Sequence, residues 1–175
     1  ALGSALLRSG YALPRPRAVS RPAGLAAPAI AAVVLALAVA TVGAPRFLTT
    51  LAQLDSPVED LGYAADLAEG YEGWKVDLGA AKPAGVPSHR WVLREPAGVV
   101  GAITPWNFPH QINLAKVGPA LAAGCTVVLK PAPDTPGAAS SVAHLAATET
   151  AIPAGVLNVV NSSDHALGAV LSTDP

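Results

Sequence analysis

The sequence predicts an α/β fold that contains part of a doubly wound parallel sheet, preceded by an N-terminal helical region. Two observations carry this prediction. Short apolar runs alternate with helical segments from residue 99 onward, and the runs are apolar without interruption. Strands of a parallel sheet are buried on both faces and therefore show such runs, while crossover helices supply the alternation.

The composition limits the class of protein. The 175 residues suffice for one ordinary domain, and with 51% hydrophobic and 13% charged residues the chain is too apolar for a disordered protein. A net charge of -1 gives no electrostatic reason to expect binding of nucleic acid or of an anionic membrane. Because Cys125 is the single cysteine, an internal disulfide and a cysteine-rich metal site are excluded. We expect no metal and a reducing, cytoplasmic setting.

Residues 1–40 differ from the rest of the chain. Arginine is their sole charged residue type, and Ala29 to Ala40 form an unbroken apolar run. A secretory signal or membrane anchor is one interpretation, although the run is shorter than the ~20 residues of a spanning helix. A helix of the domain is the second, although the run lacks a polar face. The third is a shifted reading frame, which makes the segment non-native. We expect the globular part to begin at residue 41.

The first elements of the globular part are predicted from their boundary residues. Ser56-Pro57 is typical of a helix start and predicts a helix over residues 55–71. The Pro- and Gly-rich residues 82–88 predict a loop or hairpin turn. Residues 89–95 mix apolar and polar side chains as a half-buried strand does.

The later elements alternate regularly between strands and helices. Gly124 ends one helix, and Thr135-Pro136 begins another with Thr135 as its N-cap. The predicted order is strand 99–103, helix 112–123, strand 126–129, helix 135–150, strand 156–160 and helix 164–172.

A stiff loop follows the first of these strands. Ligands of a doubly wound sheet bind beyond the carboxyl ends of its strands. Residues 104–109 lie there, and Pro105 and Pro109 restrict the backbone on both sides of Asn107. The Asn107 amide could donate to a developing oxyanion. The alternative is an asparagine that caps its own turn.

Lys130 follows the second strand directly, where a cation could bind a ribose hydroxyl or a phosphate. The alternative is a solvated lysine at a strand end. The sequence has no glycine-rich phosphate loop of the GxGxxG or GxxxxGK[ST] kind. This absence argues against a standard dinucleotide fold and against a P-loop enzyme.

An ordered series of motifs resembles the aldehyde dehydrogenase superfamily, whose members oxidise aldehydes to carboxylic acids with NAD or NADP. The similar segments are 98–109, 116–124, 126–132, 135–136, 153–160 and 168–175, with weaker similarity from residue 41 onward. The resemblance implies that residues 41–175 form part of the family's NAD-binding domain.

The resemblance also implies roles for single residues. Asn107 matches the donor to the thiohemiacetal oxyanion, and Lys116 matches a supporting lysine near the active site. The remaining matches are cofactor-binding positions: Ile103, Thr104, Pro105 and Trp106 beside the nicotinamide and its ribose, Lys130, Ala132 and Asp134 near the adenosine ribose, and Gly168 near the adenine. Pro133 stands where the family often has a ribose-binding glutamate, so the choice between NAD and NADP stays open.

The resemblance places the nucleophilic cysteine and the general-base glutamate beyond Pro175. Cys125, between a helix end and a buried strand, is expected to be a core residue. We therefore expect the isolated chain to be inactive; the alternative is a non-catalytic remnant or a partner-binding fragment. The implied partners are an aldehyde and further copies of the protein, since residues 89–95 resemble part of the family's oligomerisation arm. Nucleic acid and membrane partners are not expected.

Overall fold

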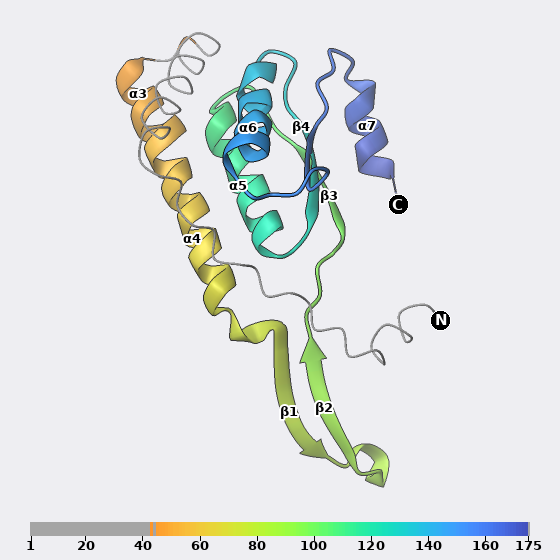
Figure 1. Ribbon diagram of the computed structural model, residues 1–175. Helices are drawn as coiled ribbons and strands as arrows, with labels where there is room; N and C mark the ends of the chain where they lie inside the picture. The colour runs from red at the N-terminus through yellow and green to blue at the C-terminus, as the bar shows by residue number, and fades with distance from the viewer. Residues whose placement is uncertain (1–42, 44, 175) are drawn as a thin grey trace.

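The computed structural model describes Gly43 and residues 45–174, which form layers of helix and sheet (Figure 1). The central sheet is parallel, with strand order β3-β4-β5. The elements that build it are β3 (Val99–Ile103), α5 (Pro109–Ala122), β4 (Thr126–Lys130), α6 (Pro136–Glu149), β5 (Leu157–Val159) and α7 (Ala166–Thr173). Figure 1 shows α5 and α6 on one side of the sheet and α7 on the other. The α/β prediction is confirmed, while the predictions for residues 1–40 lie outside the described residues.

The hydrophobic core lies between β4 and the helices α5 and α6. Val127 and Leu129 of β4 are fully buried and pack with Ala102, Val117 and Ala139. The prediction that β3 is buried on both faces is wrong, because Val99 is 70% exposed and Ile103 is 47% exposed. β3 is the outer strand of the three described ones, so only β4 covers its edge.

The residues at the helix ends determine where the helices begin and stop, and three of the predictions for these ends need correction. α5 begins at Pro109 instead of residue 112, and Gly124 ends it with φ +82° as predicted. α7 begins at Ala166 instead of 164, because the Asp164 carboxylate accepts a hydrogen bond from the Ala166 N–H at 2.8 Å. Thr135 occupies the N-cap position of α6, but its hydroxyl makes no capping hydrogen bond.

A long helical segment precedes the sheet. α3 (Arg46–Thr50), the π-helix η1 (Leu51–Asp55) and α4 (Ser56–Gly70) follow one another without a break. Ser56-Pro57 therefore begins an α-helical section but not the helical segment, which corrects the prediction of a helix start. Pro57 has no N–H for the helical ladder, and the wider π-turn before it accommodates this loss.

A two-stranded hairpin projects from the body between α4 and β3 (Figure 1). Its strands are β1 (Lys75–Ala81) and β2 (Ser88–Leu93), joined through a short 3₁₀ turn, η3 (Pro83–Gly85). The predicted turn and second strand are confirmed, whereas β1 was not predicted. The second strand is largely exposed and not half-buried, because the hairpin extends away from the core.

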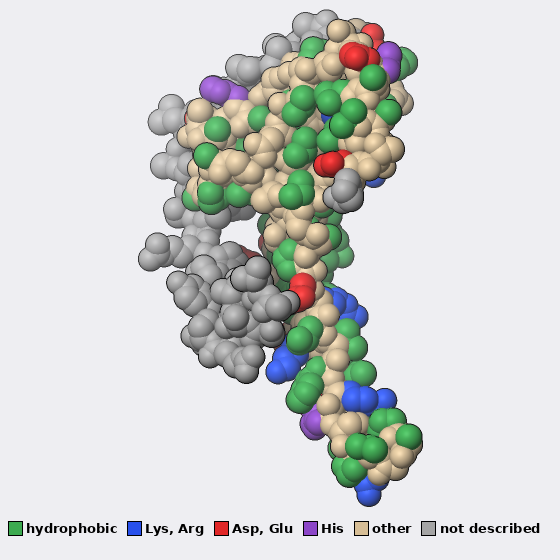
Figure 2. All heavy atoms as spheres, turned by 90° about the vertical axis from the view of Figure 1, so that its right-hand side faces the viewer, with side chains coloured by type: hydrophobic (Ala, Val, Ile, Leu, Met, Phe, Trp, Pro, Cys, Tyr) green, Lys and Arg blue, Asp and Glu red, His purple; other side chains and the backbone are tan. Residues whose placement is uncertain are grey.

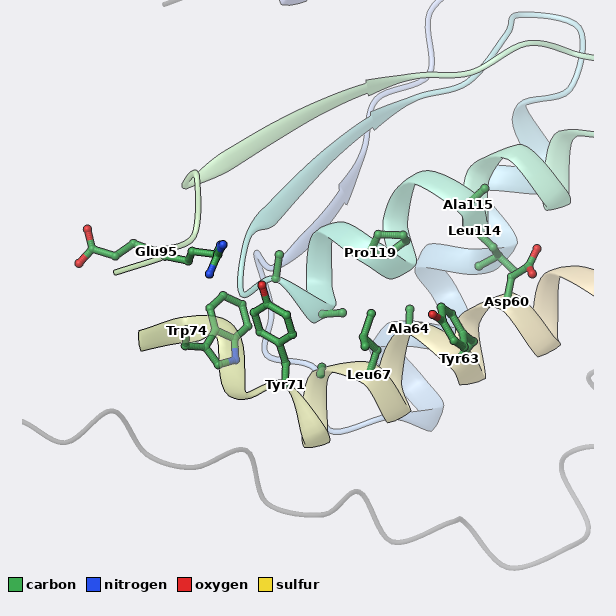
Figure 3. A pocket seen from close by; sticks show the side chains of 14 residues that line it. Asp60, Tyr63, Ala64, Leu67, Tyr71, Trp74, Glu95, Leu114, Ala115 and Pro119 are labelled. Atoms are coloured by element: carbon green, nitrogen blue, oxygen red, sulfur yellow. The ribbon is translucent and has the colours of Figure 1, made fainter. Parts of the chain in front are cut away.

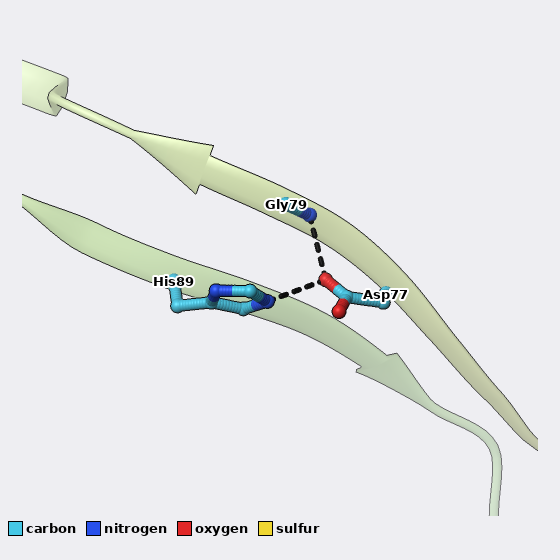
Figure 4. A network of polar contacts seen from close by, with 3 residues as sticks. All are labelled: Asp77, Gly79 and His89. Carbon is cyan, nitrogen blue, oxygen red and sulfur yellow. Dashed lines mark hydrogen bonds and ion pairs between the residues drawn. The ribbon is translucent and has the colours of Figure 1, made fainter.

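A β-bulge in the hairpin carries a small polar network (Figure 4). Asp77 Oδ1 lies 2.6 Å from His89 Nε2 and accepts a hydrogen bond from the Gly79 N–H at 2.7 Å. Gly79 has φ +74°, a conformation that a residue with a Cβ adopts only at a cost. The network thus fixes the register of an otherwise exposed hairpin. Figure 2 shows Lys and Arg side chains gathered on this hairpin.

None of the helices within residues 45–174 is long and apolar enough to cross a membrane.

Candidate functional site

The loop between β3 and α5 is tied to the sheet at its first residue. Thr104 is buried, and its N–H donates to the Lys130 carbonyl at 3.1 Å. The Thr104 hydroxyl donates to Asn113 Oδ1 of α5 at 2.6 Å. These two bonds join the end of β3 to the neighbouring strand and to the following helix, so the loop starts from a fixed point.

The other end of the loop is a strained residue. Phe108 adopts the left-handed conformation, with φ 55° and ψ 49°, and its carbonyl accepts the Ile112 N–H at 3.0 Å. A bulky residue rarely adopts this conformation, which costs on the order of 1–2 kcal/mol. The reversal at Phe108 allows Pro109 to begin α5 while the preceding residues remain at the sheet edge.

Three residues of this loop, Pro105, Trp106 and Asn107, are exposed at the carboxyl end of β3. The Asn107 side chain makes no hydrogen bond to another residue in the described part of the chain. An asparagine that caps its own turn would accept or donate such a bond. The geometry therefore favours the alternative in which the Asn107 amide is a donor for a ligand.

Lys130 lies at the carboxyl end of the neighbouring strand. Only 4% of its surface is exposed, and its Nζ donates to the Pro131 carbonyl at 3.2 Å. The alternative of a solvated lysine is wrong. A buried ammonium group has three donors, so further acceptors such as hydroxyls are needed to satisfy it.

A small cavity of about 190 Å³ opens beyond β4 and β5. It is lined by Ala132, Pro133, Pro136, Asn161, Ser162 and Ser163. Asn161 Nδ2 donates to Ser140 Oγ of α6 at 2.9 Å, which connects the two sides of the cavity. Ser162 and Ser163 were not predicted as site residues, although their place after a strand was the available signal.

Comparisons with known proteins agree with this arrangement. The sequence profile described as the aldehyde dehydrogenase family matches residues 29–175. The chain belongs to the aldehyde dehydrogenase family. It is 45% identical over 119 residues to the NADP-dependent succinate-semialdehyde dehydrogenase GabD of Escherichia coli, covering 66% of this chain and 24% of that protein.

Other members of the aldehyde dehydrogenase family are similar over shorter or more divergent stretches. The mitochondrial succinate-semialdehyde dehydrogenase of Mus musculus is 55% identical over 87 residues, which are 48% of this chain and 16% of that protein. The crystal structure of the Mycobacterium tuberculosis aldehyde dehydrogenase with NAD+ has a TM-score of 0.71 at 32% identity, covering 84% of this chain and 31% of that one. The chain thus spans about a quarter of the length of the curated relatives.

The structure brings only some of the other site residues implied by the family resemblance close to one another. Ile103 lies beside Gly168 of α7, since a Cβ on Gly168 would be 3.9 Å from Ile103 Cδ1. Ala132 lines the cavity, whereas Asp134 is exposed and does not line it. Lys116 is exposed on α5, about 10 Å along the helix from its start. These roles stay predictions.

The sequence did not predict the buried polar side chains that lie beneath the loop of Asn107. His110 and Asn113 lie on one face of α5, are 2% and 0% exposed, and burial lowers the pKa of His110 to about 4. Among the residues that the structure describes, neither ring nitrogen of His110 has a hydrogen-bond partner, nor does Asn113 Nδ2. The available signal was two polar residues three positions apart in a largely apolar helix.

Two other features lie at the opposite, amino end of the sheet. Cys125 is buried directly before β4, so the length of that strand, about 17 Å, separates it from Lys130. A cavity of about 570 Å³ forms an apolar groove between α4, the C-terminal half of α5 and the hairpin base, with Tyr71, Trp74 and Pro119 among its lining residues (Figure 3). Neither feature faces the loop that carries Asn107.

Proposed function

We propose that this chain supplies the oxyanion donor and the adenosine-side cofactor contacts for the NAD(P)-dependent oxidation of an aldehyde to a carboxylic acid. Asn107 is the donor, and Lys130 with the cavity beyond β4 and β5 receives the ribose and adenine. Either NAD or NADP, when bound, accepts the hydride that leaves the aldehyde carbon.

The position of Asn107 is the observation that carries the proposal. Its amide is exposed at the carboxyl edge of the sheet, free of bonds within the described residues, and held between a buried Thr104 and a strained Phe108. A preorganised donor of this kind stabilises the negative charge that develops on a carbonyl oxygen during nucleophilic attack. Among relatives, the E. coli enzyme is named for its action on succinate semialdehyde with NADP. We extend only the general reaction class to this chain.

A chimera tests the role of Asn107. Residues 45–174 of this chain would replace the equivalent segment of the E. coli enzyme GabD. Loss of one oxyanion donor typically lowers kcat by about 100- to 1000-fold. Steady-state assay of NADPH formation from succinate semialdehyde should therefore show this loss for Asn107→Ala.

A matched control is Asn158→Ala, which removes an exposed asparagine of β5 whose Nδ2 donates to the Gly155 carbonyl at 2.8 Å and to the Val127 carbonyl at 3.5 Å. This control should retain kcat within about threefold. An Asn107→Ala chimera with undiminished kcat would contradict the assignment.

We further propose that the isolated 175 residues do not oxidise aldehydes. Nucleophilic attack on the aldehyde needs an activated thiolate beside a base. The single cysteine, Cys125, is buried at the far end of β4. Purified chain incubated with an aldehyde and NAD+ should form no NADH above a blank without aldehyde, and measurable turnover would overturn this part of the proposal.

A further inference from the structure

We infer that Gln53 is a positioning residue that holds the loop of Asn107 in its working conformation by capping the start of α5 from another helix. The catalytic meaning of this inference rests on the proposed function, whereas the structural part does not. Gln53 lies in η1, more than 50 residues before the loop in the sequence, and is 2% exposed.

The start of α5 lacks a cap of its own. The first N–H groups of a helix have no partner within the helix and are usually satisfied by a side chain at the N-cap. Phe108 occupies that position and has no side-chain oxygen to offer. Gln53 Oε1 accepts the hydrogen bond from the His110 N–H instead, at 3.1 Å in a buried environment.

The capping bond acts on the strained part of the loop. His110 is separated from the left-handed Phe108 by Pro109 alone, and Asn107 comes directly before Phe108. A strained backbone persists only where its surroundings fix it. The bond from Gln53 fixes one side of the strained residue, and the bond between Thr104 and Asn113 fixes the other.

The local form of η1 supports this inference independently. η1 is a π-helix between two α-helices, and π-turns inside α-helices are rare and often lie at functional sites. The wider turn inserts an extra residue and so changes the direction of the side chains that follow. In this chain the side chain that it buries is Gln53.

Amide hydrogen exchange on the full 175-residue chain tests the inference. Gln53→Met keeps the approximate side-chain volume but removes the acceptor. It should raise the exchange rates of the His110 amide and of the loop amides by about tenfold, the effect of losing one buried hydrogen bond. Gln53→Glu keeps an acceptor, which the helix N-terminus favours, and should restore protection to within about threefold.

Leu61→Ala is the matched control for general destabilisation. Leu61 belongs to the same helical segment and packs against Gly118 of α5, about 13 Å along that helix from its start. If Leu61→Ala and Gln53→Met raise exchange at residues 104–110 equally, or if Gln53→Glu fails to restore protection, Gln53 is not a positioning residue.

A kinetic arm separates this inference from the proposed function. In the GabD chimera, Gln53→Met should lower kcat about tenfold and leave the KM for NADP+ within about twofold, because the adenosine-side contacts at Lys130 and the cavity beyond β4 and β5 lie on other elements. Equal loss in kcat and KM, or no loss, would overturn the catalytic role. If the parent chimera were inactive, the proposed function would fail, and the exchange result alone would decide the structural claim.

Discussion

Buried polar side chains beneath the Asn107 loop are the residue-scale feature that sequence patterns did not reveal. Asn107 and Lys130 were found from their places after two strands, and the structure shows the second to be buried. His110, Asn113 and Gln53 were missed, because their roles depend on contacts between different elements: Gln53 accepts from the His110 N–H across 57 residues of sequence, and Asn113 of α5 accepts from Thr104 at the end of β3. Periodicity describes one element at a time and carries no information about such contacts.

His110 should make the fold sensitive to acid. Burial lowers its pKa from 6.5 to about 4, so between these values the unfolded chain binds a proton that the folded chain does not. Above about pH 6.5 the free energy of unfolding does not depend on this group. It falls as the pH drops from 6.5 toward 4, by up to about 3 kcal/mol. Urea unfolding at several pH values should show this decline.

The variant His110→Leu should lose most of this pH dependence while remaining folded at pH 7. His144 is exposed on α6 and serves as a control, so His144→Gln should unfold like the parent at each pH. Retention of the full decline in His110→Leu would show that another group causes it.

At the scale of elements, glycine, proline and turn residues predicted where helices and strands end, whereas the apolar pattern of a strand did not predict how far it is buried. Gly124, Pro136 and the turn over residues 82–88 located ends that the structure confirms within a few residues. The exposure of β3 and of the hairpin was predicted wrongly, because burial depends on what covers a strand and not on its own composition. The start of α5 was misplaced because the chain reverses at Phe108 in the left-handed conformation, which a bulky residue rarely adopts and which the sequence pattern does not reveal.

Two glycines allow the cost of backbone strain and that of a steric clash to be separated. Gly124 and Gly155 have φ +82° and +86°, so alanine at either position costs about 1 kcal/mol. A Cβ at Gly124 would also lie 2.9 Å from Pro96 Cγ, whereas one at Gly155 would meet no other described residue within 4 Å.

Gly124→Ala should therefore destabilise the chain by about 2–3 kcal/mol and Gly155→Ala by about 1 kcal/mol, as measured by chemical denaturation. Equal effects of the two substitutions would argue against close packing of the α5–β4 turn on Pro96.

On the scale of the whole molecule, the chain combines the sheet edge that we propose as the nucleotide site with a projecting hairpin. Large apolar side chains remain exposed on that hairpin: Leu78, Val86, Trp91 and Leu93. Apolar surface of this kind is typical of sites where proteins associate. We propose that the hairpin mediates self-association, as the family resemblance implies.

Sedimentation velocity over a range of concentrations tests this role. The parent chain should form dimers or larger species, and Leu93→Asp should shift it toward monomer by at least tenfold in Kd. Val58, which is similarly exposed but lies on α4, provides the control, so Val58→Asp should associate like the parent. Monomeric behaviour of the parent at all concentrations would contradict this proposal.

We propose that the carboxyl edge of β3, β4 and β5 binds a nicotinamide nucleotide. To test this proposal, the isotope-labelled 175-residue chain is titrated with NAD+ and with NADP+, and binding is monitored through the chemical shifts of its amides in NMR spectra. The shifts should saturate in the millimolar range and concentrate at residues 103–107, 130–134 and 161–168, and Lys130→Met should weaken binding. Shifts confined to the apolar groove of α4 and α5, or no shifts at saturating nucleotide, would contradict it.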